Sequence, residues 1–243
     1  MSRYLAHAIG RRQRGVTGVG LRGHPLRWIS GATIGLWATE WPGDATLSRD
    51  VAFAHHKLVA AICDQGPSLP VRFGTWLVSE DVARRSVQEG EARFAAAVER
   101  LGDRREIAVT LLWQEGAGPA EPAAAVGIAP GGVEAAPEGN PGRAFLDRKR
   151  TDHAATDSRR GTAEVLAERL RSELAIEQAD VRHETCPSVE VALSLSLLAR
   201  RDQAGALKAR ATAAVATLPG VRGVVSGPWP PYSFTEDLVI AGG

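Results

Sequence analysis

Hydrophobic and polar residues alternate in short stretches along the first hundred residues, which predicts strands separated by helices. Strands are expected over 4–9, 26–29, 33–41, 70–77 and 107–113, with a hairpin turning at Ser30-Gly31. Stretches that begin near Leu47 and Ser79 repeat apolar residues every three or four positions, which indicates helices. Ser79 is expected to cap the second helix, and Gly102 is expected to end it in the left-handed conformation. This order of elements predicts a ferredoxin-like domain with one extra strand.

A stretch rich in proline, glycine and alanine follows these elements. Residues 115–141 contain Pro119, Pro122, Pro130, Pro137 and Pro141, a composition typical of a linker that buries little surface. Beyond it, apolar spacing predicts a helix over 163–174, strands over 189–197 and 221–225, and a helix from Asp202 to about Leu218. The sequence therefore predicts an α+β protein of two domains. They are a ferredoxin-like domain over 1–114 and a smaller α+β domain with an antiparallel sheet over 142–243.

Charge and composition limit the classes of partner. The formal net charge of the 243 residues is +1, which gives the whole chain no strong attraction to nucleic acid or an anionic membrane. No apolar run reaches the ~20 residues needed to span a bilayer, and the first residues lack a signal pattern. Cys63 and Cys186 stand far apart, without ligands at metal-binding spacing, and are expected to be reduced. A cytoplasmic protein is expected.

A glycine-rich loop with four arginines is the first candidate for chemistry. Residues 18–23 match G-x-G-x-x-G, but a hairpin follows them, whereas the dinucleotide-binding fingerprint opens a helix. We therefore interpret the stretch as a mobile loop in which Arg11, Arg12, Arg14 and Arg22 face solvent. An RNA- or nucleotide-binding ferredoxin-like module is the alternative function, although the basic and aromatic signature of RNA-binding strands is missing.

No cluster of residues predicts catalysis or a metal site. His55 and His56 are adjacent on a helix, so they point about 100° apart and cannot chelate one ion together. One is expected to pack and the other to face water. The sequence contains no G-x-S-x-G elbow and no cysteine with a nearby base. We expect no catalytic residue, metal, cofactor or small-molecule substrate.

Two segments are unusual enough to identify a family. The first contains Pro70, Val71, Arg72, Phe73, Gly74 and Thr75, and its arginine must find a carboxylate or carbonyl partner or lie at an exposed strand end. The second contains Gly227, Pro228, Trp229, Pro230, Pro231, Tyr232, Ser233 and Phe234. Its three prolines remove N–H donors and place the segment on a surface. Its aromatic residues either pack back as a structural clasp or form a docking site.

These segments resemble the paired hallmarks of the gas vesicle protein F/L family, and Gly142 and Arg143 begin a third segment that is similar to that family. The resemblance covers nearly the whole chain outside residues 115–140 and the tail. It implies two α+β domains, no catalysis and no cofactor. It also implies an accessory protein of gas vesicle assembly that contacts the shell protein and other accessory proteins, and that is found at the gas vesicle.

Overall fold

The computed structural model describes residues 2–16, 18–42, 48–114, 141–238 and 240, apart from the side chains of 141–148 and 151–155. Its fold is α+β with two antiparallel sheets, which confirms the predicted fold class. The chain forms two compact units. The first consists of Met1–Ile107, Leu197–Lys208 and Ser226–Gly243, and the second of Ala108–Ser196 and Ala209–Val225.

The first sheet belongs to the first unit and contains the predicted hairpin. Its strands are β1 (Ser2–Gly10), β2 (Leu26–Ser30), β3 (Gly35–Pro42), β4 (Ser68–Pro70) and β5 (Trp76–Leu77). The strand order is β2-β3-β1-β4, and β5 also pairs with β1. All these pairs are antiparallel, with Trp28 opposite Trp37 and Ile9 opposite Leu69. The central strand β1 is therefore paired on both sides.

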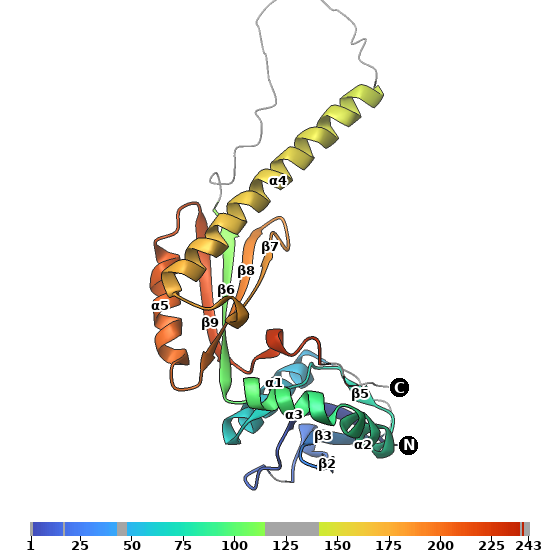
Figure 1. Cartoon of the computed structure of the whole chain (residues 1–243). Helices are drawn as coiled ribbons and strands as arrows, with labels where there is room; N and C mark the ends of the chain where they lie inside the picture. The colour runs from blue at the N-terminus through green and yellow to red at the C-terminus, as the bar shows by residue number, and fades with distance from the viewer. Residues whose placement is uncertain (1, 17, 43–47, 115–140, 239, 241–243) are drawn as a thin grey trace, which may run out of the picture. The chain divides into compact units, whose positions relative to one another are not determined.

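Helices cover both faces of this sheet. Alternate residues of β1 face opposite sides of the sheet, and a bulge between Ala6 and Ala8 shifts this alternation by one residue. Leu5 and Ile9, which are four positions apart, therefore belong to different cores. Leu5 packs with Val51 of α1 (Arg49–Gln65) on one face. Ile9 packs with Phe94 of α3 (Glu91–Leu101) on the other face, beside α2 (Glu80–Glu89). The sheet and its three helices can be followed in Figure 1.

The helix ends follow the local sequence with two corrections. Ser79 caps α2 as predicted, because its side chain accepts a hydrogen bond from the Val82 N–H over 3.2 Å. The single helix expected up to Leu101 is instead broken at Gly90 into α2 and α3. A β-carbon at Gly90 would lie 2.2 Å from Phe94 Cε2, so the close approach of that ring requires glycine. Gly102 ends α3 in a right-handed conformation, and the expected left-handed cap was wrong.

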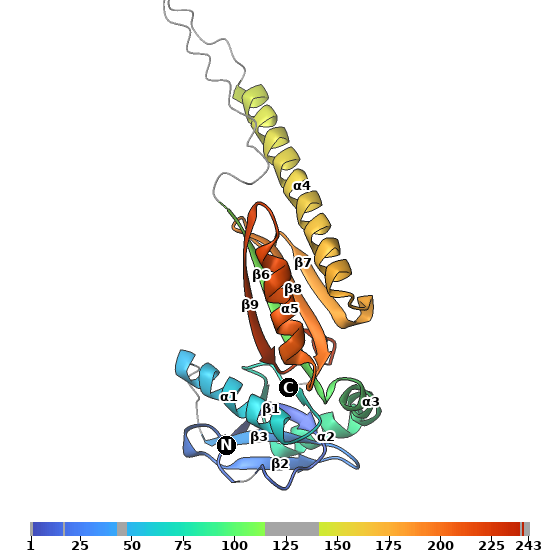
Figure 2. The same cartoon turned by 90° about the vertical axis from the view of Figure 1, so that its left-hand side faces the viewer.

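The second sheet has the order β7-β8-β6-β9. Its strands are β6 (Arg104–Trp113), β7 (Val181–Thr185), β8 (Val191–Arg200) and β9 (Val221–Trp229). Figure 2 shows the helices α4 (Pro141–Leu174) and α5 (Ala204–Ala216) against it. Short 3₁₀ helices occupy Leu21–Gly23, Gln178–Asp180 and Tyr232–Phe234. The strand predicted to complete the N-terminal sheet, β6, pairs here instead, because strand partners are set by contacts between distant residues.

The two compact units do not coincide with the two predicted domains, which are consecutive segments of the sequence. Each unit contains residues from both predicted domains, 1–114 and 142–243, because β6, β8, β9 and α5 contribute residues to both units. Of the predicted linker 115–141, residues 115–140 lie outside the described residues, and Pro141 begins α4. Helix α4 is longer than the predicted 163–174, and strand β7 was not predicted.

Candidate functional site

The two unusual segments of the sequence lie against each other within the first unit. The Thr235 hydroxyl, next to the second segment, donates to the Pro70 carbonyl over 3.4 Å. The Arg72 guanidinium forms an ion pair with the Glu236 carboxylate. We call the surface formed by residues 70–75 and 226–236 the paired-motif surface. Residues that are 164 and 165 positions apart in sequence therefore build one continuous feature of the fold.

The first segment is a turn, and the strand predicted over 70–77 was wrong in its middle. Strand β4 ends at Pro70 and β5 begins at Trp76. Gly74 has a φ of +88°, which L side chains rarely adopt, and the Thr75 hydroxyl donates to the Arg72 carbonyl over 2.9 Å. The turn leaves the Arg72 side chain 66% exposed with its carboxylate partner. The sequence predicted either a carboxylate or carbonyl partner or an exposed strand end for this arginine. The structure shows the carboxylate partner, on an exposed turn between two strands.

The second segment is part strand and part 3₁₀ helix. Strand β9, predicted to end at residue 225, runs on to Trp229, and Tyr232–Phe234 forms the 3₁₀ helix. Pro230 and Pro231 are buried, and Phe234 is only 5% exposed in the core that also contains Leu69. The prolines stand at the end of an edge strand of the second sheet, where missing N–H donors cost little. The end of this segment is therefore an internal part of the unit.

A carboxylate that the sequence did not indicate holds the 3₁₀ helix in place. Glu106 of β6, 6% exposed, accepts hydrogen bonds from the main-chain N–H and the hydroxyl of Ser233. The distances are 2.9 Å and 2.7 Å. Burying a carboxylate is costly unless it is hydrogen-bonded, and Ser233 supplies two donors. The sequence carried no signal for this role, because Glu106 precedes the predicted strand over 107–113.

The histidine pair of α1 lies beneath both segments. His55 is 1% exposed, packs edge-on against Phe73 at 5.3 Å between ring centroids, and hydrogen-bonds through Nε2 to the Ala6 carbonyl over 3.0 Å. His56 lies 5.0 Å from the Trp229 ring and 6.0 Å from the Tyr232 ring. The prediction that one histidine packs is confirmed. His56 is half-buried by these aromatic rings, whereas the sequence predicted that it faces water.

A second histidine from β1 accompanies His55. His7 is fully buried, its Nε2 lies 2.6 Å from Thr39 Oγ1, and its ring centroid lies 4.9 Å from that of His55. Burial, and then the neighbouring His55, hold the pKa of His7 well below its usual value of 6.5. Burial also lowers the pKa of His55, although the bond to the Ala6 carbonyl opposes this effect. Both imidazoles are therefore neutral at neutral pH.

Two arginines fix the C-terminal end of α1, which positions both histidines. Arg105, 5% exposed, donates to the Cys63 carbonyl and to the Asp64 carboxylate, each over 2.8 Å. Arg201 donates to the carbonyls of Cys63 and Asp64 over 2.5 Å and 2.9 Å. Guanidinium groups at this end satisfy carbonyls that lack partners in the helix and complement the helix dipole. Sequence patterns missed both residues, since they lie far from α1 along the chain.

The exposed part of the paired-motif surface is small and ordered. Trp229 is 39% exposed, yet its indole N–H donates to Ser226 Oγ over 3.1 Å and His56 packs against its ring. Arg72 lies exposed on the neighbouring turn. A fixed aromatic ring and an exposed charged pair suit contact with another protein. Gly142 and Arg143, in contrast, lie in the first turn of α4 in the other compact unit, so the first unit gathers two of the three segments.

The described residues form no metal-binding cluster, and their buried thiol is unreactive. Among them, no group of three or more histidine, cysteine or acidic residues could hold a metal ion. The buried Cys63 thiol has its pKa raised to about 12 by burial, which keeps it protonated and poorly nucleophilic. Within the part of the chain that the structure describes, none of the helices is both long and apolar enough to cross a membrane.

The fold and site define an α+β protein with two antiparallel sheets and a surface of fixed aromatic and charged side chains. A family model described as "Gas vesicle synthesis protein GvpL/GvpF" matches residues 5–236. The chain therefore belongs to the gas vesicle synthesis protein GvpL/GvpF family. It is 30% identical over 196 residues to gas vesicle protein L of Streptomyces sp. strain CB03234. The matched region covers 76% of this chain and 68% of that protein.

Solved structures show the same fold at low sequence identity. The crystal structure of gas vesicle protein GvpF from Microcystis aeruginosa matches with a TM-score of 0.72 at 15% identity, over 97% of this chain and 99% of that one. GvpF from Anabaena sp. PCC7120 matches with a TM-score of 0.70 at 14% identity, over 97% and 96% of the two chains. These structures support the fold, while the family model and the Streptomyces relative confirm the predicted gas vesicle family.

Proposed function

We propose that this protein is an accessory factor of gas vesicle assembly that acts through contacts with the shell protein and other gas vesicle proteins, without a reaction of its own. Membership of the GvpL/GvpF family supports the gas vesicle role. Trp229 carries the finer proposal. Its indole is held by Ser226 and His56, and yet 39% of the residue is exposed.

A fixed, exposed tryptophan suits binding because its surface is ordered before the partner arrives. A ring that already occupies one conformation loses little side-chain entropy on association. Tryptophan and arginine are also the residue types most often found where binding energy is concentrated. Trp229 and Arg72 therefore form the proposed contact surface, while the buried Phe234 and the half-buried Ser233 hold it in shape.

The test replaces Trp229 in the organism's own gene cluster. We expect Trp229→Ala to fold normally, because the ring is a surface group, and to lose about 2 kcal/mol or more of binding free energy, roughly thirtyfold in affinity. Co-purification of the shell protein with the tagged variant, together with the yield of buoyant vesicles, measures the loss. Thermal unfolding of the purified variant shows whether the fold survives.

Phe53→Ala is the matched control. Phe53 is a 61% exposed aromatic residue of α1 whose ring is covered by Lys57 Nζ at 4.6 Å, and it lies outside the paired-motif surface. This variant should still co-purify with the shell protein and should give the normal yield of buoyant vesicles. A folded Trp229→Ala protein that retains the shell protein and full vesicle yield would contradict the proposal.

A further inference from the structure

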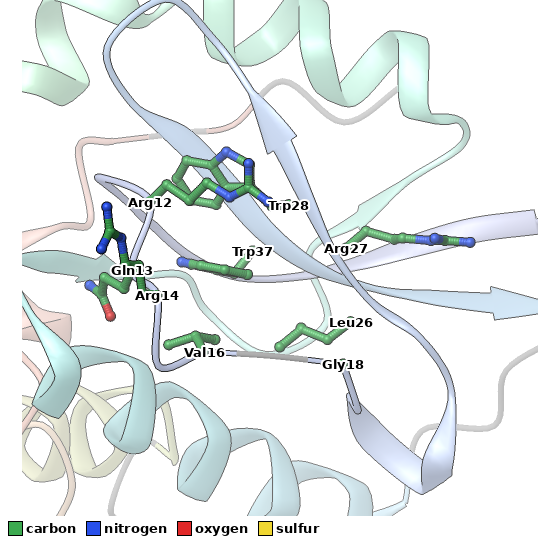
Figure 3. A pocket seen from close by; sticks show the side chains of 9 residues that line it. All are labelled: Arg12, Gln13, Arg14, Val16, Gly18, Leu26, Arg27, Trp28 and Trp37. Atoms are coloured by element: carbon green, nitrogen blue, oxygen red, sulfur yellow. The ribbon is translucent and has the colours of Figure 1, made fainter.

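A second surface of the first unit contains a pocket of about 710 Å³ between the arginine-bearing loop, residues 11–16, and the β2–β3 hairpin. The residues that line it are Arg12, Gln13, Arg14, Val16, Gly18, Leu26, Arg27, Trp28 and Trp37. In Figure 3, Gln13 and Arg14 lie on one side of Trp37, and Leu26 and Arg27 lie on the other. The pocket therefore combines an apolar floor with a basic rim.

The rim carries uncompensated positive charge. Arg27 forms an ion pair with Glu40 at 2.8 Å. Arg12 and Arg14 are exposed, and no carboxylate within the described ranges pairs with either of them. Their guanidinium groups are thus available to an anionic ligand. Arginine suits this role because its planar fork binds carboxylate and phosphate oxygens in pairs.

Two buried polar atoms at the floor have no hydrogen-bond partner among the described residues. They are Nε1 of Trp37, a residue only 3% exposed, and Oε1 of Gln13. Figure 3 shows the nitrogen-bearing end of the Trp37 indole directed toward Gln13 and Arg14. The Gln13 amide nitrogen donates to Ser68 Oγ over 2.8 Å, so its oxygen is the atom left for a ligand. An unsatisfied buried polar atom costs about 1–3 kcal/mol, which a suitable ligand would recover.

The chemistry of these two atoms distinguishes between ligand classes. The Trp37 N–H is only a donor and the Gln13 oxygen is only an acceptor, so a complementary ligand must offer one acceptor and one donor. A main-chain peptide group offers both. A phosphate group at neutral pH offers mainly acceptors and leaves the glutamine oxygen unsatisfied. Trp28 and Trp37 are tilted by 53° with ring centroids 4.7 Å apart, so they pack on each other and leave no parallel slot for a nucleobase.

We propose that this pocket binds an acidic peptide segment of a partner protein. One extended residue of the segment donates its main-chain N–H to Gln13 Oε1 and accepts from Trp37 Nε1 at its C=O, and carboxylates of the segment engage Arg12 and Arg14. Leu26 and Trp28 contact an apolar side chain of the same segment. This inference goes beyond the proposed function, because the pocket uses none of the residues of the paired-motif surface and predicts binding independently of Trp229.

The test uses the purified full chain and an array of twelve-residue peptides tiled across the other gas vesicle proteins of the same organism. We expect the retained peptides to contain two or more carboxylates. Binding of a retained peptide should weaken at least tenfold in Arg12→Glu/Arg14→Glu, and should also weaken as salt rises. Trp37→Phe removes the N–H donor and keeps most of the ring, so it should weaken the same peptide severalfold without changing its salt dependence.

Control variants separate this site from general charge effects and from misfolding. Arg22→Glu/Arg85→Glu makes the same change in charge at exposed positions outside the pocket, and it should leave binding within twofold. Trp229→Ala should bind the peptide normally, so failure of the pocket and failure of the proposed contact surface give different results. The proposal would be overturned if the protein retained no acidic peptide, or if both double variants weakened binding equally. It would also be overturned if ATP or a polyuridine strand bound more tightly than any peptide.

Discussion

Ser233 donates both its main-chain N–H and its hydroxyl to the Glu106 carboxylate, over 2.9 Å and 2.7 Å. This pair joins the 3₁₀ helix of the second sequence segment to strand β6. Phe234, the next residue, is 5% exposed in the core. The 3₁₀ helix that follows the exposed tryptophan is therefore anchored by two buried residues, Glu106 and Phe234, and replacing either of them should affect folding as well as binding.

Glu106→Gln should lower the free energy of unfolding by about 1–3 kcal/mol, the usual cost of leaving a buried hydrogen-bonding group poorly matched. A glutamine amide replaces two charge-assisted hydrogen bonds with weaker neutral ones, because its oxygen accepts from the main-chain N–H and its NH₂ donates to the Ser233 hydroxyl oxygen. Urea denaturation measures the loss. Ser233→Ala removes the hydroxyl bond and keeps the main-chain bond, so it should also lower stability. Unchanged stability in both variants would contradict the structural role of this pair.

The buried histidines predict that stability falls in mild acid. Burial lowers the pKa values of His7 and His55 below 6.5, so between pH 6.5 and those lower values the unfolded chain binds more protons than the folded one. The contribution of these two histidines to the free energy of unfolding is fully present above pH 6.5 and is lost as the pH falls through this range. Each histidine that titrates in this range changes the free energy of unfolding by at most about 1.4 kcal/mol per pH unit.

Melting temperatures measured between pH 7.5 and 5 test this dependence. His7→Gln removes one titrating group from the core and should flatten the decline, whatever it does to the melting temperature at pH 7.5. A variant that declines as steeply as the natural chain would show that other groups are responsible.

Gly90→Ala should destabilise the first unit by about 1–3 kcal/mol, because the new methyl group would overlap the buried Phe94 ring. Gly205→Ala in α5 is the matched control, since a β-carbon there meets nothing within 4 Å. Alanine also favours helix over glycine, so this control should unfold at the same or a higher urea concentration. A Gly90 variant as stable as the control would contradict the packing explanation.

Sequence patterns predicted those elements whose signal is local. Leu193, Leu195 and Leu197 alternate with serines in β8, and all three leucines are buried. Ser79 and its capping bond were also predictable, since the cap depends on the next few residues alone. Strand β7 was missed because Arg182, His183 and Glu184 are all exposed, so the strand carries no apolar alternation.

Non-local relationships could not be predicted from these patterns. The sequence placed β6 with the strands that precede it, whereas it pairs between β8 and β9, and no local feature encodes that choice. The unusual segments were visible as motifs, but their contact through Thr235 and Pro70 joins residues 165 positions apart. The loop called mobile is anchored by Leu21, which is 4% exposed and donates its N–H to Thr39 Oγ1 over 3.2 Å.

Pro228 sits near the end of β9, an outer strand of its sheet. An outer strand with a full row of N–H groups can recruit a further strand from another molecule, and proline removes one of those donors. Growth of the sheet by strand addition is thereby discouraged at this end. Under the proposed function, a partner that meets the chain here contacts side chains, above all Trp229, and adds no strand to the sheet.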